Sequence, residues 1–227
     1  MSAANDQERS VLARAARTPD ANVARRLRSV LLPRRRHLAG VAYLVLDRST
    51  SMGDPGKMDA LRDGAWGFFV EAVRRSHAVG AVTFAHDARL LSGAGLDALR
   101  LWRRLQAVQP FGSTRMEAGL AMAASRLRFR TGTRTVVLLT DGEADDRAAA
   151  LRAARTVRGM GIRLIAIGTG EADDAFLASL TGRSELARHV PRDGIAGALK
   201  HAAATLGPAP ADVATDARSD KAKKDRS

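Results

Sequence analysis

The chain of 227 residues contains no cysteine, which excludes disulfide bonds, zinc–thiolate centres and a cysteine nucleophile. Aromatic residues make up only 4% of the sequence, so few side chains are available to stack on nucleic-acid bases. The longest apolar runs have six or seven residues, far fewer than the roughly 20 that a membrane-spanning helix needs. Acidic residues and arginines precede any apolar run at the N-terminus, which is not typical of a secretory signal, and we expect a cytoplasmic protein.

The net charge of +13 is distributed along the chain. Residues 1–40 hold nine arginines and three acidic residues, whereas the basic residues further along occur singly or in pairs. Such separated charges are typical of solvated helix faces. Only Arg25–Arg36, RRLRSVLLPRRR, is dense enough to suggest an anionic partner, with a solvated or docked basic arm as the other interpretation.

The residue pattern divides the chain into three parts. Residues 1–38 are predicted to form a basic helical N-terminal extension that ends near Pro33. Residues 39–206 alternate short runs of Val, Ile and Leu with amphipathic stretches, which is the pattern of a folded domain. Residues 207–227 are polar and are predicted to be a disordered tail.

Short apolar runs within the central part predict six strands, at residues 41–46, 79–84, 88–91, 135–139, 163–168 and 185–190. Amphipathic spacing predicts helices around residues 58–72, 116–127, 146–154 and 195–206. Strands that alternate with helices predict an α/β fold, in which a doubly wound, mostly parallel sheet carries helices on both faces. Only His86 and Asp87 separate the second and third runs, so the third is predicted to be an antiparallel edge strand.

Oxygen-bearing side chains follow several of these elements, where ligands bind in an open parallel sheet. The first strand ends in Asp47, and Ser49 and Ser51 follow at alternate positions, so that the three side chains can face the same way. Thr114 precedes a predicted helix, and Asp141 follows the strand at residues 135–139. Carboxylate and hydroxyl oxygens suit a hard cation such as Mg²⁺, which prefers six of them. These residues offer five oxygens, of which two are charged, so a bound ion would remain electrophilic toward a carboxylate from a partner. The alternative is that they only end strands and open turns.

The segments LVLDRSTSMG, GSTRM and VVLLTDGE occur in this order around the predicted strands. They resemble the three-part metal-ion-dependent adhesion site of the von Willebrand factor A domain, a likeness that covers about residues 39–206. The resemblance implies a Rossmann-like fold and a divalent cation, usually Mg²⁺ or Mn²⁺, that grips an acidic side chain of a protein ligand. The ligands that it implies are Asp47, Ser49, Ser51, Thr114 and Asp141.

The second loop departs from the Gly-Gly-Thr that the family more often shows. This chain has Gly112-Ser113-Thr114, so either Ser113 or Thr114 could face the metal, and we favour Thr114. Asp145 and Asp146 are interpreted as caps of the helix that follows them, not as metal ligands.

We therefore interpret the chain as a metal-dependent protein-binding module and not as an enzyme. Resemblance to bacterial intracellular members implies a subunit or adaptor of an ATPase-, kinase- or phosphatase-associated system. A magnesium-dependent phosphohydrolase is the first alternative, although Ser49 stands where such enzymes need a second carboxylate. A nucleic-acid-associated protein acting through Arg25–Arg36 is the second.

Overall fold

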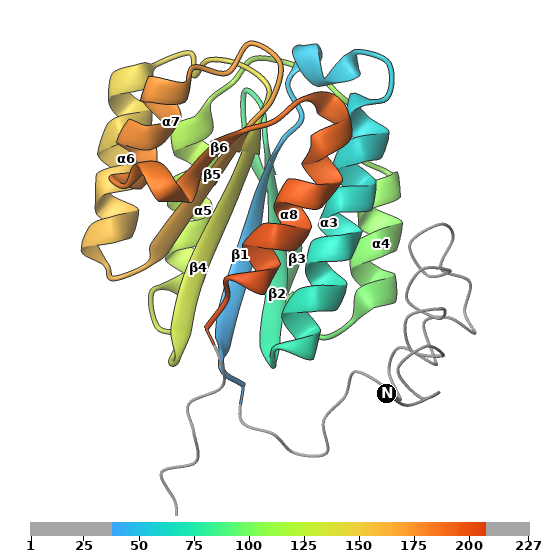
Figure 1. Cartoon of the computed structure of the whole chain (residues 1–227), viewed down its shortest axis with the longest axis vertical. Coiled ribbons are helices and arrows are strands. Elements are labelled where there is room, and N and C mark those ends of the chain that lie inside the picture. The colour runs from blue at the N-terminus through green and yellow to red at the C-terminus, as the bar shows by residue number, and fades with distance from the viewer. Residues whose placement is uncertain (1–37, 208–227) are drawn as a thin grey trace, which may run out of the picture.

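The computed structural model describes residues 38–207, which form a central sheet with helices on both faces (Figure 1). The predicted helical extension and the predicted disordered tail lie outside the described residues, apart from Leu38 and Gly207 at their boundaries. None of the described helices is long and apolar enough to cross a membrane.

Six strands form one sheet in the order β3-β2-β1-β4-β5-β6. They are β1 (Gly40–Asp47), β2 (His77–Phe84), β3 (Ala88–Gly95), β4 (Thr133–Thr140), β5 (Arg163–Gly168) and β6 (Ala187–His189). Strand β3 runs antiparallel to β2, and every other neighbouring pair is parallel, which confirms the predicted fold class. Strand β3 extends beyond the predicted run at residues 88–91, and its pairing with β2 is irregular near Ala81.

The helices of the described part of the chain are α3 (Lys57–Arg74), α4 (Ala98–Gln106), α5 (Met116–Leu127), α6 (Arg147–Gly159), α7 (Asp174–Thr181) and α8 (Ile195–Ala204). Residues 38–207 also contain three short 3₁₀ turns, each between a strand and a helix, η1 (Thr50–Gly53), η2 (Ser184–Leu186) and η3 (Arg192–Gly194). The four predicted helices correspond to α3, α5, α6 and α8, whereas α4 and α7 were not predicted from the sequence.

Strand β1 lies in the middle of the sheet and is buried along its whole length. Leu44 and Leu46 pack into the core beneath α3, α4 and α8, whereas Tyr43 and Val45 pack into the core beneath α5, α6 and α7. A parallel strand covered on both faces needs this continuous apolar sequence. The packing holds the carboxyl end of β1, and therefore Asp47, in a fixed place.

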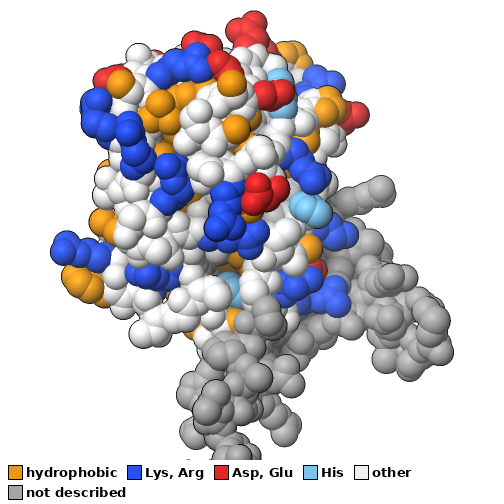
Figure 2. Space-filling view, turned by 60° about the vertical axis from the view of Figure 1, so that its left-hand side comes forward, with side chains coloured by type: hydrophobic (Ala, Val, Ile, Leu, Met, Phe, Trp, Pro, Cys, Tyr) orange, Lys and Arg blue, Asp and Glu red, His pale blue; other side chains and the backbone are white. Residues whose placement is uncertain are grey.

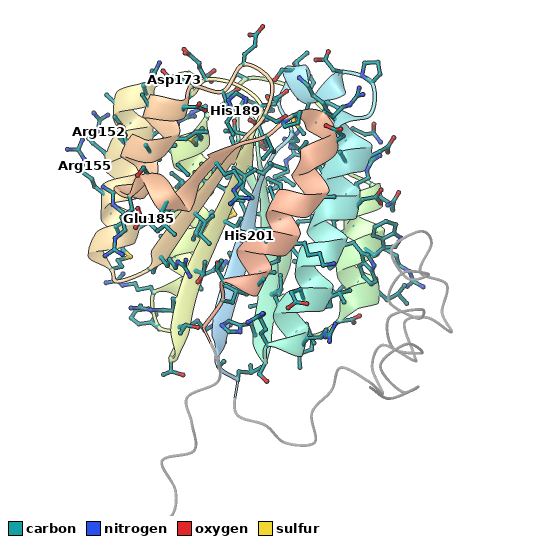
Figure 3. All side chains as sticks on the ribbon, in the orientation of Figure 1. Arg152, Arg155, Asp173, Glu185, His189 and His201 are labelled. Carbon is teal, nitrogen blue, oxygen red and sulfur yellow. The ribbon has the colours of Figure 1, made fainter. Side chains whose placement is uncertain are left out.

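The chain winds from β1 toward β2 and β3 on one side and toward β4, β5 and β6 on the other. The winding direction therefore reverses between β1 and β4, and in open α/β sheets ligands bind at the carboxyl ends of the strands at such a reversal. Asp173 lies at this end of the domain, whereas Arg152 and Arg155 lie on the outside of α6 (Figure 3). On the face seen in Figure 2, Lys and Arg side chains form several separate groups with acidic side chains among them.

Candidate metal centre

The five residues predicted from the sequence lie on three loops at this end of the sheet. Asp47 is the last residue of β1 and is fully buried, and Ser49 and Asp141 are only 2% exposed. Thr114, two residues before α5, is 9% exposed, whereas Ser51 in η1 is exposed. The loops therefore place two buried carboxylates beneath a hydroxyl that reaches the surface.

Hydrogen bonds connect four of the five residues. The Ser49 backbone N–H donates to Asp47 Oδ1 at 2.8 Å, and the Ser49 and Ser51 hydroxyls are 3.0 Å apart. The Ser51 hydroxyl donates to Asp141 Oδ1 at 2.7 Å. A continuous chain of contacts thus runs from β1 to β4 through Asp47, Ser49, Ser51 and Asp141.

The directions of these bonds leave lone pairs available. A carboxylate only accepts, so the Ser51 proton points at Asp141, and Ser51 Oγ must accept the proton of Ser49. Each serine oxygen then keeps at least one lone pair for a further partner. The arrangement suits the serines as neutral oxygen ligands, because their protons are engaged in this chain of hydrogen bonds and their remaining lone pairs are not.

The second loop is attached to the loop after β4 by its backbone. The Thr114 N–H donates to both carboxylate oxygens of Asp145 at 3.0 Å, and the Asp145 N–H donates to the Thr114 carbonyl at 3.1 Å. The interpretation of Asp145 as a helix cap is therefore wrong, because its carboxylate is engaged across the loops. The cap is Asp146, which accepts from the Ala149 N–H at 2.8 Å, as predicted.

The same loop is attached to the first loop as well. The backbone N–H and the hydroxyl of Thr50 both lie 3.0 Å from the Gly112 carbonyl, to which they donate. Gly112 has a φ of 87°, which favours glycine, and a Cβ there would lie 2.7 Å from Nδ1 of His86. Ser113 is exposed and Thr114 is buried, which favours Thr114 as the ligand of this loop. Within residues 38–207 the Thr114 hydroxyl makes no hydrogen bond with the other four candidates.

Burial dominates the electrostatics of Asp47. It raises the pKa of this carboxyl from its ordinary value of 3.8 to about 6, although hydrogen bonds from Ser49 and Thr140 lower it. The nearby charge of Asp141 adds to the rise. An ionised Asp47 is therefore costly in the metal-free site, and a cation bound beside it would relieve this cost.

A lysine supplies part of that positive charge. Lys57 Nζ at the start of α3 is 2.8 Å from Asp141 Oδ2, 2.8 Å from Asp54 Oδ2 and 3.2 Å from the Ser51 carbonyl. Partial burial alone would lower the pKa of Lys57, but the hydrogen bonds and charges of Asp141 and Asp54 outweigh it and raise that pKa.

Three residues of the site were not predicted from the sequence as parts of it. Thr140 donates its hydroxyl to Asp47 Oδ2 at 2.7 Å, Asp145 holds the second loop, and Lys57 pairs with Asp141. Thr140 carries a local signal, because a polar residue that ends an apolar strand must satisfy its hydroxyl inside the core. No local sequence signal marks Asp145 or Lys57 as part of the site, since their partners are distant in the sequence.

The donor set fits a hard divalent cation. Within residues 38–207 there is no group of three His, Cys, Asp or Glu side chains that could hold a metal ion, so a centre here would also need other oxygens, such as those of hydroxyl groups. Two carboxylates joined by serine hydroxyls match the preference of Mg²⁺ and Mn²⁺ for oxygen and offer nothing to a thiophilic metal. The residues are therefore suited to the ion that the motif implies.

Comparison with known proteins gives one family match. Residues 42–143 match the family model of the von Willebrand factor type A domain, and all five candidate ligands lie within that segment. A search of curated proteins found no match.

Solved structures share the fold at low sequence identity. The pilus adhesin SpaC from Lactobacillus rhamnosus GG is 16% identical with a TM-score of 0.69, and the match covers 76% of this chain and 31% of SpaC. The vWF domain of the type V pili tip protein Mfa5 from Porphyromonas gingivalis is 12% identical with a TM-score of 0.69, covering 78% of this chain and 99% of that domain. A von Willebrand factor type A structure from Catenulispora acidiphila is 19% identical with a TM-score of 0.65, covering 74% of this chain and 43% of that one.

This chain thus matches only about a third of the length of SpaC, and the structural likeness at these identities concerns the fold alone. The family model of the von Willebrand factor type A domain thus matches residues 42–143, and solved structures of such domains share the fold of residues 38–207.

Proposed function

We propose that residues 39–206 form a divalent-metal-dependent protein-binding module, which grips an acidic side chain of a partner protein. The observation that carries the proposal is the hydrogen-bonded chain of Asp47, Ser49, Ser51 and Asp141 at the point where the winding of the sheet reverses. A bound Mg²⁺ or Mn²⁺ would supply an electrophilic position for an outside carboxylate.

The candidate ligands and the loop that holds Thr114 have different roles in the proposed module. Asp47 and Asp141 supply the two negative charges, and Ser49 and Ser51 supply neutral oxygens. The backbone contacts of Thr114 with Asp145 hold the second loop beside them. Neutral donors leave the ion incompletely neutralised, and Ser51 is exposed, so a partner can approach from solvent.

The wider role follows from the resemblance. We propose a cytoplasmic subunit or adaptor of an ATPase-, kinase- or phosphatase-associated system, in which the partner brings the Asp or Glu carboxylate. The pilus proteins among the structural neighbours bear on the fold and are compatible with an adhesive or binding role for such domains. Enzymatic activity is not part of the proposal, because the carboxylate that accepts the Ser51 proton, Asp141, is assigned to the metal, and Ser49 stands where a phosphohydrolase needs a second carboxylate.

The first experiment measures thermal unfolding with and without metal. At a hundredfold excess over Kd, a ligand stabilises the folded state by about 2.7 kcal/mol, which raises the Tm of a domain this size by roughly 5–10 °C. We expect this shift with Mg²⁺ or Mn²⁺ and its loss in Asp47→Ala/Asp141→Ala. The control is Asp59→Ala/Glu185→Ala, which removes two exposed carboxylates outside the hydrogen-bonded chain. An equal shift in the wild type and in the Asp47/Asp141 variant would contradict the site.

The second experiment tests the alternatives. Partner capture from cell extract should be lost in EDTA and should survive moderate salt. Capture that persists in EDTA and disappears with salt would support binding through Arg25–Arg36 instead. Magnesium-dependent hydrolysis of p-nitrophenyl phosphate that is lost in Asp47→Asn would support the phosphohydrolase.

A further inference from the structure

Lys57 connects the candidate centre to the exposed loop beside it. Its ammonium group contacts the carboxylate of Asp141, whose side chain is fully buried, and the carboxylate of Asp54, whose side chain is 66% exposed. The side chain of Lys57 is itself only 15% exposed. One lysine therefore bridges a candidate metal ligand and a solvent-facing acid, at 2.8 Å from each.

The backbone holds this lysine in place. Lys57 is the first residue of α3, and its N–H donates to the Asp54 carbonyl at 3.1 Å. The residue before it, Gly56, has a φ of 80°, which turns the chain from the loop into the helix. The position of Nζ is thus determined by the loop that also contains Ser51, whose carbonyl it contacts.

We propose that Lys57 is a built-in counter-cation of the candidate centre, which pairs with Asp141 in the metal-free protein and moves to Asp54 when a divalent ion takes the Asp141 carboxylate. The inference rests on the proposed metal site and goes further, because it assigns a residue that sets the affinity and links metal binding to the loop at residues 50–56.

The physical reason is competition for one buried carboxylate. In the metal-free protein Lys57 offsets the repulsion between the two buried acids, Asp47 and Asp141. A divalent ion that binds Asp141 meets the ammonium group at short range, and like charges in a partly buried site repel strongly. Asp54 offers the ammonium group a second partner without a large movement, because it is already in contact.

The test measures Mg²⁺ affinity by isothermal titration calorimetry and thermal unfolding in EDTA, both on the full chain. Lys57→Met is expected to tighten Mg²⁺ binding by roughly tenfold or more, because the competing charge is gone. The same variant is expected to unfold at lower temperature in EDTA, because Asp141 then lies buried without its counter-charge. A lysine that merely supported the fold would weaken both quantities, so the opposite signs identify the counter-cation.

Asp54→Asn gives the second measurement at an exposed position where folding is not at stake. It should weaken Mg²⁺ binding several-fold, because Lys57 loses its alternative partner, and have little effect in the Lys57→Met background. Arg115→Met removes an exposed positive charge beside Thr114 and is the matched control, with an affinity expected to stay near the wild-type value.

The outcomes separate the two proposals. Wild-type protein that binds no Mg²⁺ or Mn²⁺ would overturn both. Wild-type protein that binds Mg²⁺, with an affinity that is unchanged or weaker in Lys57→Met, would overturn the counter-cation and leave the metal site in place. Equal effects of Asp54→Asn in both backgrounds would also overturn it.

Discussion

Asp47→Asn should stabilise the metal-free protein at neutral pH while it abolishes metal binding. The asparagine fits the same hydrogen bonds, because its carbonyl oxygen can accept from the Ser49 N–H and its amide can donate to the Thr140 hydroxyl. The Thr140 proton can then turn to the Gly142 carbonyl, 3.2 Å away. The substitution thus removes a buried charge and keeps a hydrogen bond with Ser49 and with Thr140.

The size of the stabilisation by Asp47→Asn and its pH dependence follow from the pKa of Asp47. Its rise from 3.8 to about 6 means that the ionised carboxylate costs the folded state about 3 kcal/mol above pH 6. The folded state binds this proton more tightly than the unfolded state does, so the wild type loses this stability as pH rises from about 4 to about 6. The Asp47→Asn variant lacks the titrating group, so its stability should not fall for this reason between pH 4 and pH 6.

The assay is urea unfolding of both proteins in EDTA at pH 4 and pH 7.5, followed by the same comparison in saturating Mg²⁺ at pH 7.5. We expect similar stability at pH 4, a more stable variant at pH 7.5 in EDTA, and a reduced or reversed difference in Mg²⁺. A variant that is less stable than the wild type in EDTA at pH 7.5 would refute the reasoning, since the buried charge would then not be a cost.

Two further predictions concern other residues. Asp145→Ala should weaken Mg²⁺ binding by roughly tenfold, because the second loop loses its attachment to the loop after β4. Asp146→Ala should instead cost about 1 kcal/mol of stability through the lost α6 cap, without a change in Mg²⁺ affinity. Calorimetry measures the affinities and urea unfolding the stabilities, and equal Mg²⁺ affinities of the two variants would contradict the role of Asp145. Burial lowers the pKa of His77, which contacts the Arg75 carbonyl through Nδ1. The contribution of this histidine to stability should therefore be complete above pH 6.5 and be lost below it, as the imidazole is forced to protonate. A His77→Gln variant with an equally steep fall would exclude this histidine as the cause.

The strands were predictable because each is a short apolar run, and a parallel strand buried on both faces needs such a run. The two unpredicted helices give weaker signals. Helix α4 has only nine residues and is rich in arginine, and α7 has eight residues in a short apolar stretch that does not distinguish a helix from a strand. Strand β3 continues through Gly93 and Gly95, which are poor strand formers, so its end was not predictable.

The candidate ligands were predictable because each stands at the end of a strand or before a helix, in an order that a known motif shares. The residues around them were not predictable in the same way. Asp145 and Asp146 are adjacent acids before a helix, and the sequence does not tell which one caps it and which one reaches Thr114. The contact of Lys57 with Asp141 joins residues 84 positions apart, so it exists only once the sheet has assembled.

The two ends of the described domain meet at the amino ends of the central strands β1 and β4, opposite the candidate centre. The Thr133 N–H donates to the Ala39 carbonyl at 2.9 Å, and a Cβ at Gly207 would lie 3.4 Å from Thr133 Cγ2. Whatever is joined to either end, whether an affinity tag, a sensor surface or another domain, is therefore attached at the pole far from Asp47 and Asp141 (Figure 1). Ends this close also allow the domain to be inserted into a surface loop of a host protein, with the candidate centre turned outward.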